Sequence, residues 1–361
     1  MAPALDLSRR HCVATLAGGL LAAPFTAHAV PSGVPEALAR PAERVAKPQD
    51  AVLLAAARAG ERWVAVGERG LVVTADATAR RWTQAAQVPV STTLTAVRFI
   101  DTQRGWAVGH GGVVLSTQDG GEHWLRQLDG RMAAQLTQTQ AASSVNPRAQ
   151  AEAQRLVADG PDKPFLDLYF SSAHEGCVVG AYNLCFQTVD GGAHWAPISE
   201  RLDNPKALHL YAIAGQGQQR YIAGEQGMLF RSDDAGRSFQ RLTSPYVGSW
   251  FALALLDAQT LVVAGLRGHA YLSHNGGQQW TALDGAPPVS FVSAVVAPGG
   301  NVLLANQAGQ LFLLKPGQTT LTPLPMPALP PTQGAWPLGP DQVLVLTAQG
   351  ALAVPLQKAA P

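Results

Sequence analysis

Charge is scarce in this 361-residue sequence. Only 14% of the residues are charged, and the formal net charge is +1. Without the first 29 residues, the chain keeps 24 basic residues (26 − 2) and 24 acidic ones (25 − 1), so it is formally neutral. A neutral chain lacks the basic surface through which proteins attract polyanions. The composition therefore argues against a nucleic-acid partner.

Cysteine is also rare. The chain has three cysteines, and only Cys177 and Cys185 follow residue 29. They flank an expected hairpin turn, and two thiols on adjacent strands can form a disulfide in an oxidising compartment. The alternative is a pair of buried free thiols. Two cysteines without further ligands in zinc-site spacing do not indicate a metal site, and no cofactor is expected.

Long hydrophobic runs are absent beyond the N-terminal segment. Residues 1–29 contain Arg9 and Arg10, an apolar stretch, and the small-residue sequence Ala27-His-Ala29. This pattern predicts a cleavable signal peptide, and Ser8-Arg9-Arg10 is similar to the twin-arginine signal. No later apolar run reaches 18 residues, so the mature chain should have no transmembrane segment. We expect an exported, periplasmic protein whose oligomeric state the sequence leaves open.

A short polar segment closed by an aromatic residue recurs along the chain. Its copies start at Thr117, Thr188, Ser232 and Ser273, and a degraded copy starts at Thr74. The pattern is Ser/Thr-x-Asp-x-Gly-x-x-Trp, in which the Asp is expected to accept hydrogen bonds from the turn and the Trp to pack in the core. The residues expected to have this structural role are Asp119, Gly121, Trp124, Asp190, Gly192, Trp195, Asp234, Gly236, Phe239, Asn275, Gly277 and Trp280.

A tetrapeptide precedes each segment at nearly constant spacing. The copies that begin with glycine start at Gly67, Gly109, Gly180, Gly224 and Gly265, and weaker copies start at Asn306 and Thr347. Successive starts are 42, 71, 44, 41, 41 and 41 residues apart. A period near 42 with one insertion of about 29 residues (71 − 42) predicts seven repeats of one structural unit.

Each repeat contains material for four strands. An apolar run begins about fifteen residues before each tetrapeptide, as at 94–99 and 291–296, and continuous hydrophobicity is typical of strands buried on both faces. Paired glycines suit tight hairpins, which need positive φ. The sequence predicts an all-β, seven-bladed β-propeller with four-stranded blades, in a single domain at 50–361. Residues 30–49 are expected to be an N-terminal linker that could supply a closing strand.

The repeat resembles known families. The Asp-Gly-Gly-x-x-Trp segments resemble the Asp-box, or bacterial neuraminidase (BNR) repeat, of sialidases and of non-enzymatic propellers. The whole repeat, with Gly105-Trp-Ala-Val-Gly109 before the hairpin, resembles the photosystem II stability and assembly factor family and its relatives in non-photosynthetic bacteria. That resemblance implies a seven-bladed propeller, photosynthesis-related in photosynthetic members, that binds photosystem II reaction-centre precursors.

The insertion lies between the second and third repeats, at about 129–163. It is rich in Ala and Gln and is interrupted at Asn146-Pro147, so it predicts two short helices or a loop. Propeller connectivity places it on the same face as the glycine hairpins. Side chains at the hairpin tips vary in chemistry at fixed geometry, as expected for a partner-binding rim. The rim candidates are Glu68, Arg69, His110, Tyr182, Glu225, Gln226 and Arg267.

Two functional classes remain open at this point. The first is a non-enzymatic scaffold or assembly factor for a membrane protein or its exposed segment, with an accessory subunit of an envelope transport complex as a variant. The second is a sialidase-like glycoside hydrolase. Hydrolysis needs two carboxylates roughly 5 to 10 Å apart, and Asp167 with Glu225 or Glu68 is the pair that the sequence offers. We expect no catalytic residues.

Overall fold

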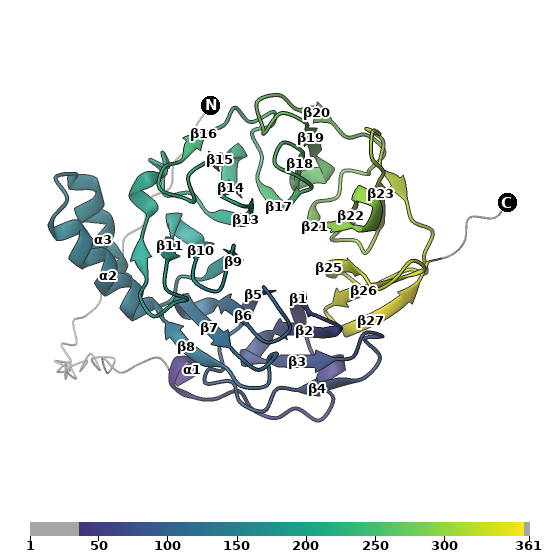
Figure 1. Ribbon diagram of the computed structural model, residues 1–361, viewed down its shortest axis with the longest axis horizontal. Coiled ribbons are helices and arrows are strands. Elements are labelled where there is room, and N and C mark those ends of the chain that lie inside the picture. Colours follow the sequence, from purple (N-terminus) through teal and green to yellow (C-terminus); the bar gives the residue numbers. More distant parts are fainter. Residues whose placement is uncertain (1–35, 357–361) are drawn as a thin grey trace, which may run out of the picture. The chain divides into compact units, whose positions relative to one another are not determined.

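Seven antiparallel sheets account for most of residues 36–356, the part of the chain that the computed structural model describes. The expected signal peptide at 1–29 lies outside this range. Six sheets have four strands and one has three, each in sequential order, and Figure 1 shows them arranged around a common axis. Neighbouring inner strands contact one another around the whole ring, including the contact between β25 and β1.

The strands follow one another in chain order. The first three sheets consist of β1 (Leu53–Ala59), β2 (Arg62–Gly67), β3 (Val72–Ala75) and β4 (Trp82–Gln84); β5 (Leu94–Phe99), β6 (Gly105–Gly109), β7 (Val113–Thr117) and β8 (Leu125–Leu128); and β9 (Phe165–Phe170), β10 (Gly176–Gly180), β11 (Cys185–Thr188) and β12 (Ala196–Pro197). The next two consist of β13 (Leu210–Gln216), β14 (Gln219–Gly224), β15 (Leu229–Ser232) and β16 (Gln240–Arg241); and β17 (Trp250–Leu255), β18 (Leu261–Gly265), β19 (Ala270–Ser273) and β20 (Thr281–Ala282). The last two consist of β21 (Phe291–Ala297), β22 (Asn301–Asn306), β23 (Leu311–Leu314) and β24 (Thr322–Pro323); and β25 (Thr332–Pro337), β26 (Gln342–Thr347) and β27 (Gly350–Pro355).

Side chains, not a shared strand, join the last sheet to the first. Leu344 and Leu346 of β26 belong to one buried cluster with Leu53 and Trp63 of the first sheet. Residues 36–52 contain the short helix α1 (Glu36–Ala39) and the 3₁₀ turn η1 (Pro48–Asp50), but no strand. The expected closing strand is therefore missing from 36–49, and the seventh sheet has three strands within the described residues. The apolar contact supplies the closure that strand pairing would otherwise give.

Backbone hydrogen bonds define two faces of the ring. On one face, the hairpin between the second and third strands bonds to the residue that precedes the inner strand, as in His110 N–H to Thr93 O at 2.8 Å. On the other face, the Asp-box turn bonds to the turn after the inner strand, as in Gly120 N–H to Gln103 O at 2.9 Å. We call these the hairpin face and the box face.

The segment between β8 and β9 forms two helices, α2 (Gly130–Ala142) and α3 (Pro147–Asp159), which lie outside the ring of sheets in Figure 1. The Asp129 side chain caps α2 by accepting from the N–H groups of Arg131 and Met132, and Pro147 suits the first turn of α3. Ala133, Ala134 and Leu156 pack into the core shared by the second and third sheets. Among residues 36–356, neither these helices nor any other is long and apolar enough to cross a membrane.

The second residue of every inner strand is a β-bulge. The pairing register skips this position in all seven sheets, for example at Leu54 between Leu53 and Ala55. A bulge re-aims a side chain away from the regular alternation of a strand. The seven bulge residues, Leu54, Thr95, Leu166, Tyr211, Phe251, Val292 and Gln333, all line one central cavity. Because inner strands start on the hairpin face, this ring of side chains lies toward that face.

Candidate functional site

The side chains of the box face are occupied within their own turns. Asp190 Oδ1 accepts from Thr188 Oγ1 at 2.9 Å and from the His194 N–H at 2.9 Å, while Thr188 Oγ1 accepts from the Gly192 N–H at 2.8 Å. The same bonds recur in the turns that start at Thr117, Ser232 and Ser273. These bonds give the box residues a structural role.

The hydrogen bonds also set the charge state of the box carboxylates. The backbone N–H and the side chain of His194 hold the pKa of Asp190 at about 2. The hydroxyl and the backbone N–H of Ser238 hold the pKa of Asp234 at about 2. Both groups are therefore ionised near neutral pH, and a general acid would need a raised pKa.

The aromatic residues of the boxes pack between neighbouring sheets. Trp124 is buried in a cluster with side chains of the first and second sheets, and its Nε1–H donates to Gly121 O at 2.9 Å. Trp195 packs in the cluster of the second and third sheets, edge-on to Phe170. Each box thus connects a turn to the core between two blades.

The rim candidates lie at the tips of the hairpins on the other face. Glu68, Arg69, His110, Tyr182, Gln226 and Arg267 are exposed, and Glu225 is half-buried. At the third tetrapeptide position, Arg69, Tyr182, Gln226 and Arg267 have φ of 54°, 54°, 53° and 57°. A residue with a Cβ pays roughly 1 kcal/mol or more for left-handed backbone. Four hairpins therefore keep a large side chain at a position where glycine would be less strained. In the second hairpin of the chain, this position is Gly111.

The flanking glycines have a packing role instead. A Cβ at Gly67 or Gly109 would collide with the carbonyl oxygen of Val52 or Thr93, and one at Gly70 would collide with Val90 O. The hairpin backbone thus lies directly against the loops that lead into the inner strands. A Cβ at Gly67, Gly70 or Gly109 would therefore disturb the fold, whereas the side chains of the second and third positions differ from hairpin to hairpin.

Tyr182 and Glu225 are brought together through His209. The Tyr182 N–H donates to His209 Nδ1 at 3.3 Å, and the His209 N–H donates to Glu225 Oε2 at 3.1 Å. The His209 ring stacks edge-on with Tyr182, with ring centroids 4.6 Å apart. Three of the remaining candidates line other hollows: Glu68 and Arg69 line one with residues 40–52, and Gln226 lines one with Arg241.

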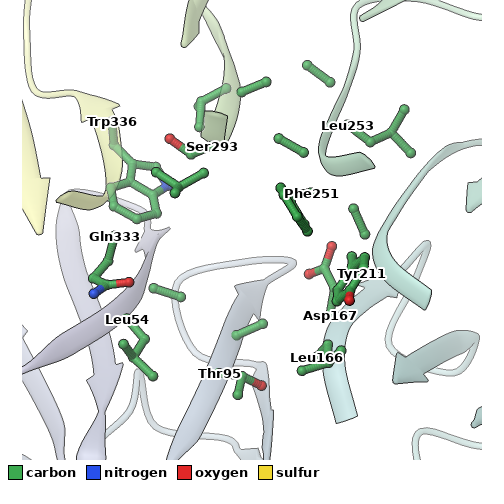
Figure 2. Close-up of a pocket in the computed structure, with 18 of the residues that line it drawn as sticks. Leu54, Thr95, Leu166, Asp167, Tyr211, Phe251, Leu253, Ser293, Gln333 and Trp336 are labelled. Carbon is green, nitrogen blue, oxygen red and sulfur yellow. The ribbon is translucent and has the colours of Figure 1, made fainter. Parts of the chain in front are cut away.

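Figure 2 shows the cavity at the centre of the ring, which has a volume of about 320 Å³. Tyr211, Phe251 and Asp167 lie on one side, and Trp336 and Gln333 lie across from them. The Tyr211 and Phe251 rings meet edge-on with centroids 5.1 Å apart. Aromatic side chains thus lie on both sides of the cavity, with the bulge residues Leu54, Thr95 and Leu166 also in its lining.

Asp167 joins three inner strands. Its Oδ1 accepts from Arg98 Nη2 of β5 at 3.2 Å and its Oδ2 from the Ile213 N–H of β13 at 2.9 Å. Burial raises the pKa of Asp167, and the Arg98 guanidinium opposes this effect in part. Among the described residues that line the cavity, Asp167 is the only carboxylate. The pairing with Glu225 or Glu68 that hydrolysis would require is therefore not formed inside this cavity.

The two cysteines lie on β10 and β11, with Sγ atoms 3.8 Å apart. In this structure both are buried free thiols, and a disulfide between them stays a prediction. The register pairs Cys177 with Gln187 and Cys185 with Val179, so the two residues are diagonal neighbours. Burial raises the pKa of the Cys185 thiol well above its usual value.

Sequence reasoning missed His209, Tyr211, Phe251 and Trp336. The signal available was positional: Tyr211 and Phe251 are both second residues of inner strands, and His209 lies two residues before Tyr211. Continuous hydrophobicity in these strands hid which side chains turn toward the axis, because the bulge interrupts the alternation that would have revealed it.

The fold and the box turns define the class of protein, a β-propeller built from Asp-box repeats. A family model described as photosynthesis system II assembly factor YCF48 matches residues 52–145 and 146–328. The chain therefore belongs to this YCF48 family, as the resemblance of its repeats predicted.

Individual relatives match over shorter stretches. The photosystem II assembly lipoprotein Ycf48 of Synechococcus sp. (strain CC9902) is 32% identical over 119 residues, which are 32% of this chain and 36% of that protein. The photosystem II assembly protein Ycf48 of Thermosynechococcus vestitus is 26% identical over 196 residues, 54% of this chain and 48% of that protein. The chain thus spans about a third to a half of the length of the curated relatives that it matches.

Solved structures show the same fold at low identity. One, described as YCF48 bound to D1 peptide, has a TM-score of 0.61 and 16% identity, and the match covers 86% of this chain and 95% of the other. A GH74 xyloglucanase from Xanthomonas campestris has a TM-score of 0.63 and 15% identity, and the match covers 87% of this chain and 53% of the other. At these identities the likeness shows the fold alone. The relatives matched by sequence are named as assembly factors.

Proposed function

We propose that this chain is an exported, non-enzymatic assembly factor whose hairpin face holds an exposed segment of a membrane protein. The observation that carries the proposal is the set of large, exposed side chains on left-handed backbone at the hairpin tips, Arg69, Tyr182, Gln226 and Arg267; the left-handed non-glycine residues of the box turns, Ala79 and Ala235, are small. Strained residues persist where the fold over-determines them, and they cluster at functional sites. Membership of the YCF48 family supports the assembly role.

The kind of partner follows from the family and from the charge of the rim. A YCF48 protein has been solved with a D1 peptide, which supports a membrane-protein segment as the client. Arg69 and Arg267 are separated by acidic Glu68 and Glu225, so the rim is of mixed charge. We infer binding by shape and by local contacts, in the periplasm, with long-range attraction contributing little.

The test is affinity capture from solubilised membranes with the mature chain as bait. The helical hairpin can be excised by joining Gly130 to Pro161, because a Cβ on Gly130 would lie 2.7 Å from Pro161 Cα. A second bait has Arg69→Glu with Arg267→Glu. We expect each change to reduce the captured membrane proteins several-fold.

Two controls keep the result interpretable. Thermal melting must show that each bait is folded, since excision exposes the core around Leu184 and Phe186. A charge reversal on the box face, Arg237→Glu, should leave capture unchanged. If both altered baits capture the same proteins as the original at the same yield, the proposed function is wrong.

A further inference from the structure

Four aromatic rings form a continuous path on the hairpin face. Tyr182 at the tip of the third hairpin contacts His209, His209 contacts Tyr211, and Tyr211 contacts Phe251, with centroids 4.6, 6.0 and 5.1 Å apart. Tyr182 is 57% exposed and the other three are partly exposed. We call these four residues the aromatic track.

The track connects two cavities. Tyr182 lines a cavity of about 240 Å³ between α3 and the third sheet, with Leu156, Leu184 and Phe186 among its walls. Tyr211 and Phe251 line the central cavity, as Figure 2 shows. A cavity of about 150 Å³ is enough for benzene, so both ends of the track have room for a large apolar side chain.

The geometry of the rings favours a polypeptide. Successive ring planes meet at 63°, 66° and 68°, so the rings present notches and not a flat platform. Aromatic-lined grooves are a recurring surface for extended peptide segments, and pockets that take alternate side chains give such binding its specificity. In an extended chain, side chains on one face repeat about every 6.6 Å, so the 4.6 to 6.0 Å between successive rings allows about one such side chain for each pair of rings.

The charges along the track disfavour acidic side chains. Lys163 lies over the Tyr182 ring but is ion-paired with Asp159 at 2.6 Å, and Arg98 is paired with Asp167. Both cations are thus already matched. Glu225 accepts from the His209 backbone N–H, and its Oε2 lies 3.7 Å from His209 Nδ1. Glu225 therefore places an acidic group beside the centre of the track, while the cations near the track are already ion-paired.

We propose that the aromatic track binds an extended polypeptide segment that has apolar side chains at alternate positions and no acidic ones. Alternate side chains enter the notches between the rings, and larger ones enter the cavities at the two ends. This inference rests on the proposed function and specifies the chemistry of the segment that the hairpin face holds. The seven bulges supply the positioning, because they turn Tyr211 and Phe251 toward the mouth of the cavity.

Fluorescence anisotropy with labelled ten-residue peptides tests the proposal. The probe has leucine alternating with serine and blocked ends; one comparison peptide has glutamate in place of serine, and another has the same composition with its leucines adjacent. We expect the alternating neutral peptide to bind at least tenfold more tightly than the acidic one, and several-fold more tightly than the one with adjacent leucines. A cello-oligosaccharide serves as the competing ligand class.

Variants of the track supply the second measurement. Tyr211→Ala, Phe251→Ala and Tyr182→Gly should each weaken peptide binding about tenfold, the effect expected of aromatic residues at a binding hot spot. Ala235→Gly is the matched control, because Ala235 has the same left-handed backbone as Tyr182 but lies in a box turn on the opposite face. We expect it to change binding less than twofold.

The outcomes separate this inference from the proposed function. The inference is overturned if the neutral peptide does not bind at millimolar concentration, if the oligosaccharide competes for the track, or if the variants bind as the original does. If excising the helices abolishes membrane-protein capture while the track variants capture normally, the function stands and the track is wrong. If the track variants lose peptide binding, but the helix excision and the Arg69→Glu with Arg267→Glu bait both capture membrane proteins normally, the track stands and the function is wrong.

Discussion

The box face and the hairpin face are built from the same repeat but use their polar side chains in opposite ways. At the box face, Asp190 and Thr188 satisfy the backbone of their own turn, and Trp195 leads into the core. At the hairpin face, Arg69 and Arg267 adopt left-handed backbone while their side chains remain exposed. Left-handed non-glycine residues occur on both faces, but in the box turns they are the small Ala79 and Ala235, whereas at the hairpin tips they have large, exposed side chains that a partner can contact.

This difference separates residues that stabilise the fold from residues that are available for binding. A hydrogen bond that closes a turn stabilises the blade whatever the protein does. A strained, exposed arginine weakens the blade slightly, so it needs another reason to be present. Substitutions should therefore separate the two faces: box changes should lower stability without affecting binding, and tip changes should affect binding without lowering stability.

The largest effect is expected midway between the faces, at Asp167. Asp167→Ala removes the acceptor for the buried Ile213 N–H and the partner of Arg98, so we expect a loss of about 3 kcal/mol in the free energy of unfolding. Urea denaturation would measure it. Gln333→Ala, in the same cavity, should cost much less. Equal losses would show that cavity volume, and not the three-strand connection, stabilises the centre.

The second effect should appear on the box face. Thr188→Val keeps the side-chain shape but removes the oxygen that accepts the buried Gly192 N–H. Leaving that donor unsatisfied should lower the free energy of unfolding by about 2 kcal/mol without any change in membrane-protein capture. Thermal melting and the capture assay measure the two effects. Loss of capture in a folded Thr188→Val protein would show that the box face also contributes to binding.

The architecture could be predicted from the sequence because each repeat is marked by its turn residues. The spacing of Gly67, Gly109 and the later copies gave seven units, and Asn146-Pro147 marked the break between α2 and α3. No closing strand forms at 36–49, because ring closure depends on contacts between β26 and the first sheet, which are distant in sequence. The rim was located by connectivity, but the aromatic track was missed because the bulges that expose Tyr211 and Phe251 leave no local signature.

A third, smaller effect should appear at the hairpin tips with the opposite sign. Replacing Arg69, Gln226 or Arg267 with glycine relieves left-handed strain, partly offset by the greater freedom of glycine in the unfolded chain. We expect the free energy of unfolding to stay constant or to rise by up to about 1 kcal/mol. Urea denaturation measures the change. Gly111→Ala, at the equivalent position, is the reciprocal control and should destabilise, since its Cβ would also lie 2.9 Å from Leu38 Cδ2.

If the three glycine variants all destabilise while Gly111→Ala does not, the tips are not strained, and the main argument for a functional hairpin face is lost. A mixed result would locate the strain at particular hairpins. Because each variant changes one exposed side chain, the same proteins can be used as baits, so that stability and capture are measured on one preparation.

The smallest effect concerns acid stability of the box face. Asp190 and Asp234 have pKa values of about 2 against 3.8 for a free carboxyl, because His194 and Ser238 donate hydrogen bonds to them. A folded-state pKa that is depressed adds stability above the unfolded pKa, and this stability is lost as the pH falls from about 4 toward 2.

One box of this chain already has a residue that cannot titrate: Asn275 keeps the bond from the Gln279 N–H through its amide oxygen. We therefore expect Asp190→Asn with Asp234→Asn to melt below the original at pH 6 and to approach it near pH 2.5, as measured by thermal melting across that range. If the difference between the two melting temperatures stays constant with pH, ionisation of these carboxylates does not stabilise the fold. The stability of the box face then depends on hydrogen-bond geometry alone.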